Sequence, residues 1–295
     1  MVSWNPGTGW ISERNIVRIR LLGPLEVENS GQRLTLTAPR ERSVLSLLLL
    51  EANRVVSIDR LVEVLWGEFP PATARVQIQI CISAIRRSLT RIGAPGVVET
   101  RPPGYQFCVA PEVIDIHLLD ALVREAGVAL QDNRLSAAET ALTSALDLWA
   151  GPLLADVDNE VVESHRVSLA GRRLALVEEL YAIKLQRGAT AEVIAALRIL
   201  VTQNPLRESL HAQLMEALFL AGQRADALKV YRRAARLLKY ELGIPPSRRL
   251  VTLMEQVLDD GRAAESRYAR GVHLGQHLPP VTRAGDRLDR LITHQ

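Results

Sequence analysis

The chain has 295 residues, of which 47% are hydrophobic and 23% are charged, so it is long enough for two ordinary domains with apolar cores. It contains no apolar run of the roughly 18 to 20 residues that a membrane-spanning helix needs. It has no secretion-signal pattern at its start, and its two cysteines are too few for a disulfide framework or a zinc site. We therefore expect a cytoplasmic protein without a structural metal, whose formal net charge of +3 permits binding to a polyanion without requiring it.

The first part of the chain is predicted to form a tail followed by short strands. Residues 1–16 show no periodicity and are expected to form a flexible tail, which could even precede the native start. The next segment, VRIRLLGPLEVENSGQRLTLT, alternates polar with apolar residues and is interrupted by Gly-Pro and Asn-Ser-Gly. This pattern predicts antiparallel strands joined by turns.

Three helices and a hairpin are predicted next. APRERSVLSLLLLEAN has a proline early in the helix, and SIDRLVEVLWGE begins with Ser57 as N-cap and ends at Gly67. Two prolines break the chain before a third helix at about residues 72–92. After it, VVETRPPGYQFCV has two β-like runs around Pro-Pro-Gly, which predicts a hairpin.

Strands, three helices and a closing hairpin within roughly 95 residues predict a winged helix-turn-helix domain at residues 17–110. In such a domain the third helix enters the major groove of DNA and the hairpin lies along the backbone. Residues 17–110 contain twelve arginines against eight aspartates and glutamates, so the cationic excess lies in the part with the DNA-binding pattern.

The predicted third helix has two apolar sides. One side has the spacing of a buried face and is expected to pack in the core; it consists of Ile78, Ile82, Ile85 and Leu89. The other side is unusually apolar for a surface helix, and it carries Val76, Gln77, Ile80, Cys81 and Ala84.

Two interpretations of this second side remain open. It could dock in a DNA groove, with Val76, Ile80 and Ala84 against thymine methyl groups and Gln77 or Gln79 on adenine edges. Alternatively, it packs locally against the hairpin or the second domain.

Arginines surround this helix and could hold phosphates. Backbone amides at the start of the first helix already favour anions, and arginines at both ends of the third helix would set its register on DNA. An arginine at the hairpin tip, Arg101, could reach the minor groove or the flanking backbone. The other candidates, for which a solvated surface position is the alternative, are Arg40, Arg42, Arg75, Arg86 and Arg87.

From about residue 115 the pattern is helical throughout, and it predicts a second domain at residues 112–260 followed by a flexible tail at 261–295. A small-large-small spacing recurs at the 34-residue period of tetratricopeptide repeats. Stacked repeats of this kind offer a concave surface to partners. The copies are Ala227, Tyr231 and Ala234, then Val193, Leu197 and Leu200, and out of phase Ala138, Leu142 and Ala145.

The predicted fold class is therefore mainly α: an α+β winged helix-turn-helix domain followed by an all-α, tetratricopeptide-like domain. These segments resemble the Streptomyces antibiotic regulatory proteins from about residue 17 to residue 258. The match is carried by VRIRLLGPLEV, LSLLLLEANRVVSIDRLVEVLWGEFPPATAR, TRPPGYQFCV, LDLWAGPLLADV and the long block NPLRESLHAQLMEALFLAGQRADALKVYRRAARLLKYELGIPPSRRL. The last block looks like the family's bacterial transcriptional activation domain.

The resemblance implies a transcriptional activator of an antibiotic or other secondary-metabolite gene cluster. Family members bind direct repeats near the −35 promoter element, usually as two protomers side by side, and recruit RNA polymerase holoenzyme through its sigma factor. The resemblance also implies that Gln77, Cys81 and Ala84 face bases, that Arg86 and Arg101 meet the backbone or minor groove, and that Tyr105 closes the wing.

The chain also departs from the family pattern. Val76, Ile80 and Ala84 stand where polar or basic residues are usual, and Ala150 replaces a commonly basic residue after the tryptophan. A relaxed or T-rich site, or a stronger reliance on polymerase contacts, would fit these changes. The resemblance covers no nucleotide-binding or sensor domain, so we expect a small, stand-alone member.

An enzyme and an interaction scaffold are the two alternative classes of function. No GxxxxGK[ST] or GxSxG segment is present, so neither catalysis nor a cofactor is expected. His273 and His277 have the spacing of two metal ligands on a helix, but they lack acidic or cysteine companions, so no metal is expected either. The remaining alternative is a non-catalytic interaction scaffold in which the helical repeats bind a protein and the winged helix is degenerate.

Overall fold

The computed structural model describes residues 17–259, so the two predicted tails, with His273 and His277, lie outside the described residues. By their internal contacts the described residues form two compact units, which divide between Ala189 and Thr190. Within the described range, no helix combines the length and the apolar character needed to cross a lipid bilayer.

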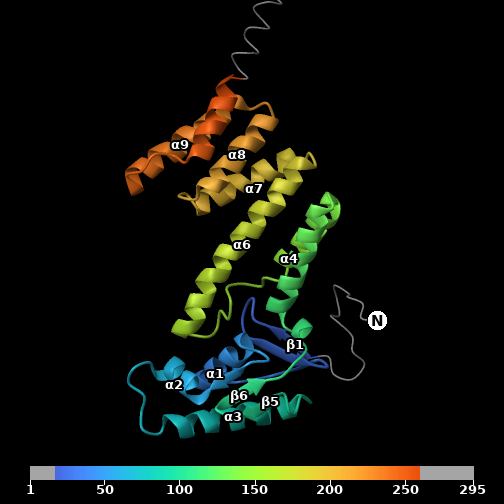
Figure 1. The fold of residues 1–295 in the computed structure, drawn as a ribbon, viewed down its shortest axis with the longest axis vertical. Coiled ribbons are helices and arrows are strands. Elements are labelled where there is room, and N and C mark those ends of the chain that lie inside the picture. The colour runs from blue at the N-terminus through green and yellow to red at the C-terminus, as the bar shows by residue number, and fades with distance from the viewer. Residues whose placement is uncertain (1–16, 260–295) are drawn as a thin grey trace, which may run out of the picture. The chain divides into compact units, whose positions relative to one another are not determined.

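The N-terminal unit begins with two small antiparallel sheets and three helices, which Figure 1 shows together at one end of that unit. In the first sheet Ile19 is opposite Val27, and both side chains are buried while their neighbours are more exposed. This is the alternation expected of strands with one face on a core. The elements are β1 (Val17–Arg20), β2 (Glu26–Asn29), β3 (Gln32–Arg33), α1 (Pro39–Leu50), β4 (Val55–Ser57), α2 (Ile58–Trp66), α3 (Ala74–Arg91), β5 (Val98–Arg101) and β6 (Gly104–Phe107).

Local signals place the ends of the helices as predicted. Pro39 occupies the first turn of α1, where backbone N–H groups have no partner within the helix, so the absence of an N–H on proline costs no hydrogen bond. The Ser57 hydroxyl accepts a hydrogen bond from the Arg60 N–H at 3.1 Å and caps α2. Gly67 ends α2 with a φ of 61°, which favours glycine. The sequence predictions for these positions are confirmed.

The hairpin after α3 forms the wing. β6 pairs with β5 on one side and with β4 on the other, so the wing is a three-stranded sheet of order β4-β6-β5. Gly104, at the start of β6, lies so close to the backbone of Val56 and Ser57 that a Cβ atom there would overlap the Val56 carbonyl oxygen. The predicted winged helix-turn-helix is confirmed.

A short 3-10 helix and three α-helices complete the described part of the N-terminal unit, and their hydrophobic core is continuous with that of the winged helix. The predicted domain boundary near residue 111 therefore does not interrupt the packing, and the division into domains 17–110 and 112–260 stays a prediction. The added elements are a short 3-10 helix (Pro111–Val113), α4 (Asp115–Gln131), α5 (Leu135–Leu146) and α6 (Glu160–Gln186).

A buried carboxylate joins the winged helix to α4. Asp115 Oδ2 accepts hydrogen bonds from the backbone N–H groups of Leu21 and Leu22, both at 2.8 Å. The loop after α5 closes the same junction, because Ala150 N–H donates to the Leu22 carbonyl and Leu154 N–H to the Leu21 carbonyl. Burial raises the pKa of Asp115 from 3.8 to about 6, although the two N–H donors favour its ionised form.

The buried Asp115 should make the free energy of unfolding fall as the pH rises. Between the unfolded pKa near 3.8 and the folded pKa of about 6, the folded protein holds more protons, so rising pH destabilises it across this window. The free energy of unfolding of the wild type, minus that of Asp115→Asn, should fall by about 2 kcal/mol between about pH 4 and pH 7. Urea unfolding of both proteins across that range measures the difference, and a flat or rising difference would contradict the assignment.

The C-terminal unit is helical throughout its described part. Helix α8 packs against both α7 and α9, and a further helix runs from residue 248 to the last described residue. Of the predicted repeat positions in α7 and α9, Val193, Leu197, Ala227 and Ala234 are buried, as are all three in α5, whereas Leu200 and Tyr231 are half-buried. The prediction of an all-α, repeat-like region is confirmed, and the bounds are α7 (Thr190–Gln203), α8 (Glu208–Leu220) and α9 (Arg224–Leu242).

Candidate nucleic-acid interface

Helix α3 has one buried face and one exposed face, as its sequence suggested. The predicted core stripe is confirmed, because each of its four side chains is at most 1% exposed. On the opposite side, Val76 is 56% and Ile80 is 62% exposed. The alternative that these two residues are covered by the hairpin is therefore excluded, as is cover by any other described part of the N-terminal unit.

The exposed side extends further along the helix than the sequence analysis recognised. Val76, Ile80, Ser83 and Arg87 are all exposed and follow the same 0, 4, 7, 11 spacing as the buried stripe, shifted by two residues. We call these four residues the outer face. Ser83 was missed although this shifted spacing would have found it; its hydroxyl donates to the Gln79 carbonyl at 2.8 Å, and Gln79 is exposed beside it.

Cys81 needs a correction. Its side chain is only 7% exposed and belongs to the hydrophobic core, and burial is the main cause of the raised pKa of its thiol. Position 81 is three residues after Ile78 and four before Ile85, so on a helix it lies beside the buried stripe. The expectation that Cys81 faces bases therefore finds no support. Ala84, on the flank of the outer face, is half-buried.

Gln77 is held by neighbours on the protein surface. Arg40 Nη1 donates to Gln77 Oε1 at 2.8 Å, and Gln77 Nε2 donates to the Thr73 hydroxyl at 2.9 Å. The Arg40 guanidinium also lies 5.5 Å from the centroid of the Trp66 ring, a cation–π distance. Gln79 is therefore the amide better placed to read a base, since Gln77 would first have to leave its partners.

Arg86 joins α3 to the wing. Its Nε donates to the Val98 carbonyl at 3.0 Å and its Nη2 to the Thr100 hydroxyl at 2.9 Å. The guanidinium lies 5.8 Å from the ring centroid of Tyr105, which is buried. Tyr105 thus has the place expected of a residue that closes the wing, and the burial leaves it little surface for DNA. Arg86 keeps three of its five N–H donors, two on Nη1 and one on Nη2, for the predicted phosphate contact.

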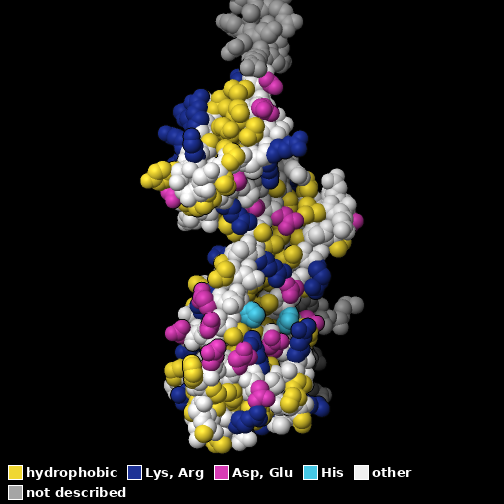
Figure 2. Space-filling view, turned by 60° about the vertical axis from the view of Figure 1, so that its left-hand side comes forward, with side chains coloured by type: hydrophobic (Ala, Val, Ile, Leu, Met, Phe, Trp, Pro, Cys, Tyr) yellow, Lys and Arg dark blue, Asp and Glu magenta, His cyan; other side chains and the backbone are white. Residues whose placement is uncertain are grey.

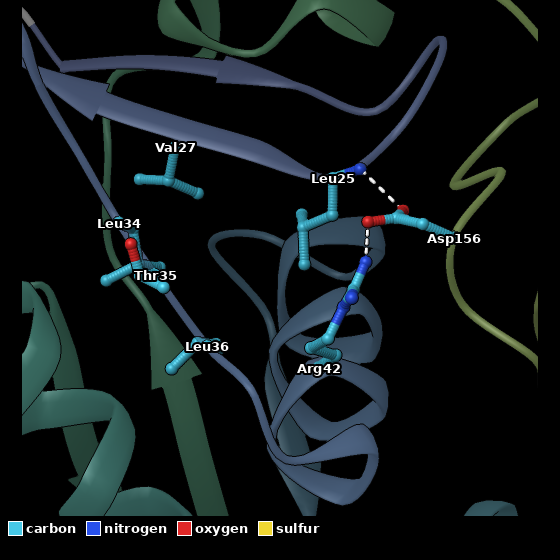
Figure 3. Close-up of a pocket in the computed structure, with 7 residues that line it drawn as sticks. All are labelled: Leu25, Val27, Leu34, Thr35, Leu36, Arg42 and Asp156. Carbon is cyan, nitrogen blue, oxygen red and sulfur yellow. Dashed lines mark hydrogen bonds and ion pairs between the residues drawn. The ribbon is translucent and has the colours of Figure 1, made fainter.

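Arg42 is occupied inside the N-terminal unit. Its guanidinium forms an ion pair with Asp156, whose other carboxylate oxygen accepts from the Leu25 N–H at 2.7 Å. Figure 3 shows this chain of contacts at one end of a pocket of about 210 Å³ between the first sheet and α1. A phosphate contact by Arg42 would have to replace a partner that the sequence could not reveal, since Asp156 is 114 residues away.

Three of the predicted phosphate-binding arginines are exposed: Arg75, Arg87 and Arg101. Arg75 forms an ion pair with Asp59 and Arg101 forms one with Glu99, and all four side chains are well exposed. Exposed pairs of this kind contribute about 0 to 1 kcal/mol, so a phosphate can replace the carboxylate at small cost. Arg87, on the outer face, is exposed as well.

The described residues contain no group of three or more histidine, cysteine, aspartate or glutamate side chains that could hold a metal ion. On the outer face of α3 they expose the apolar side chains of Val76 and Ile80, with Gln79 and arginines beside them. Arg86 joins the same helix to the wing. This arrangement is suited to base edges and phosphates.

Comparison with known proteins agrees with this geometry. The family model described as "Transcriptional regulatory protein, C terminal" matches residues 31–107, and the model described as "Bacterial transcriptional activator domain" matches residues 114–258. The chain is similar to regulatory protein DnrI of Streptomyces peucetius, with 34% identity over 250 residues that cover 82% of this chain and 92% of DnrI.

Longer relatives match over part of their length. Regulatory protein AfsR of Streptomyces coelicolor is 34% identical over 83% of this chain, which spans 24% of AfsR. The chain spans 62% of transcriptional regulatory protein EmbR of Mycobacterium tuberculosis. A solved structure of EmbR in complex with a low-affinity phosphopeptide superposes with a TM-score of 0.80 at 30% identity, covering 89% of this chain and 72% of that one.

Fold, exposed helix face and sequence matches together define a winged-helix transcriptional regulator with a helical activator domain. The match to DnrI extends over almost the whole of that regulator. The chain belongs to the Streptomyces antibiotic regulatory protein family.

Proposed function

We propose that this protein activates transcription by binding promoter DNA through α3 and the wing and by recruiting RNA polymerase holoenzyme through its helical region. In this proposal residues 17–110 bind DNA and residues 112–260 contact the polymerase, including its sigma factor. The outer face of α3 carries the argument, because it leaves two β-branched side chains exposed in the first half of an arginine-flanked helix.

The chemistry of the outer face favours a thymine-rich site. Val76 and Ile80 lie one helical turn apart and can contact thymine methyl groups, which only the major groove presents. Gln79 beside them can pair with an adenine edge. Arg75, Arg87 and Arg101 would exchange solvent or a surface carboxylate for phosphates and set the register.

The biological setting follows from the family. We infer that the protein controls a secondary-metabolite gene cluster, binds direct repeats near the −35 element as two protomers side by side, and acts in the cytoplasm at the nucleoid. DnrI and AfsR, both regulatory proteins from Streptomyces, support this setting. The proposal includes no catalysis and no cofactor.

A salt series on promoter DNA tests the proposal. The full chain should bind a duplex from the promoter next to its own gene, with log K falling linearly against log salt by about 0.9 for each phosphate contacted. With four to six such contacts, affinity should fall on the order of 100-fold or more between about 50 and 200 mM salt. A protein-interaction scaffold with a degenerate winged helix would show no such binding, and that result would overturn the proposal.

A further inference from the structure

Helix α9 of the C-terminal unit carries a concentration of positive charge that the proposed DNA contacts do not use. Its sequence RADALKVYRRAARLLKYEL has six lysines and arginines against two carboxylates. Figure 2, which turns the left-hand side of Figure 1 forward, shows lysine and arginine side chains beside hydrophobic ones on this unit.

The charge borders an apolar surface. Arg233, Arg236 and Tyr240 follow one face of α9, and together with Leu237 and Lys239 they line an open hollow of about 740 Å³. Leu237 is half-buried and forms its floor, whereas Tyr240 is 86% exposed at its edge. We call these five residues the α9 surface.

The cations of the α9 surface are available for a partner. Among residues 17–259, no carboxylate lies within ion-pair distance of Arg233, Arg236 or Lys239. The ion pair recorded on this helix, between Lys229 and Asp226, lies nearer its N-terminal end. Further apolar side chains are exposed near the end of the helix, namely Leu242 in the last turn of α9 and Ile244 just after it.

We propose that the α9 surface binds an acidic, amphipathic segment of a partner protein. Glutamate or aspartate side chains would pair with Arg233, Arg236 and Lys239, and a leucine or phenylalanine would enter the hollow against Leu237 and Tyr240. Arginine and tyrosine are enriched at the energetic centres of protein interfaces, because both combine apolar area with directed hydrogen bonds.

Other occupants fit less well. DNA would use the cations but not the apolar floor, since a phosphate backbone offers no apolar side chain. Residues 260–295 of the chain contain six arginines against four carboxylates, so their charge does not complement the surface. A second copy docking through the same face would place like charges together, which is unfavourable.

A labelled synthetic peptide of about 16 residues, which as a helix would be about 24 Å long, tests the proposal. It would carry glutamates on one face and leucine and phenylalanine on the other. The full chain should bind it in fluorescence anisotropy, and a version with lysine in place of glutamate should bind at least about tenfold more weakly. The double variant Arg233→Glu with Arg236→Glu should lose about tenfold in affinity for the acidic peptide, and Tyr240→Ala several-fold.

The matched control is Arg198→Glu, which reverses an exposed arginine on α7 of the same unit and should change affinity less than about twofold. Absence of peptide binding, or equal losses in the α9 and α7 variants, would overturn the proposal. The proposal would also be overturned if the α9 variants lost affinity for non-specific duplex DNA and kept their affinity for the peptide. Promoter binding by the same variants should be unchanged, so the inference and the proposed function can fail independently.

Discussion

Replacing Ile80 with glutamate is expected to lower the affinity for promoter DNA on the order of 100-fold without unfolding the protein. The substitution removes an apolar contact from the centre of the outer face and places a negative charge opposite bases and phosphates. Because the side chain is 62% exposed and makes no core contact, the free energy of unfolding should change by no more than about 0.5 kcal/mol. Glutamate also keeps a good helix propensity.

A matched control for this variant is Ile199→Glu. Ile199 is 61% exposed in the middle of α7, so the same change is made on a helix of the other unit at the same exposure. It should leave DNA affinity within about twofold of wild type, because no DNA contact is proposed for α7 and a single exposed charge is screened by salt. Equal losses in both variants would point to the net charge of the protein, and unchanged binding by Ile80→Glu would place the outer face away from DNA.

Replacing Gly104 with alanine is expected to cost on the order of 3 kcal/mol or more of the free energy of unfolding. The new methyl group would overlap the Val56 carbonyl oxygen, and the Ser57 backbone is also within contact. Both neighbours are backbone atoms in the paired strand β4, so neither can rotate away as a side chain would. The β5–β6 hairpin must separate from β4 to accept the change, and DNA affinity should fall with it.

The control for this variant is Gly127→Ala in α4. A methyl group at Gly127 meets no other atom within 4 Å, and alanine in a helix interior is favoured over glycine by about 1 kcal/mol. The two substitutions should therefore change the urea midpoint in opposite directions. If Gly104→Ala leaves the midpoint unchanged, the close approach between β6 and β4 is not present in solution.

Local rules predicted most of the fold. The cap at Ser57, the stop at Gly67 and the hairpin around Pro-Pro-Gly each depend on a few adjacent residues, and each prediction is confirmed. The buried stripe of α3 was predictable for the same reason, since its spacing follows directly from 3.6 residues per turn.

The predicted site was less complete, because the fate of a polar side chain depends on partners far along the chain. Arg42 forms an ion pair with Asp156, and Asp115 accepts hydrogen bonds from the N–H groups of Leu21 and Leu22. These partners are far apart in the sequence, so no periodicity predicts the contacts. Arg86 was expected on a phosphate but holds the wing to α3, because folding brings Val98 and Thr100 beside it.

The amino-acid sequence alone therefore determined the family, the order of strands and helices, and the buried stripe of α3, because these depend on motifs and spacing within one segment. Tertiary structure decided that Cys81 lies in the core, that the winged helix shares that core with α4 to α6, and that the cations of α9 border an apolar hollow. The physical reason is that burial and charge pairing are settled by which surfaces meet, and residues that meet are often a hundred positions apart.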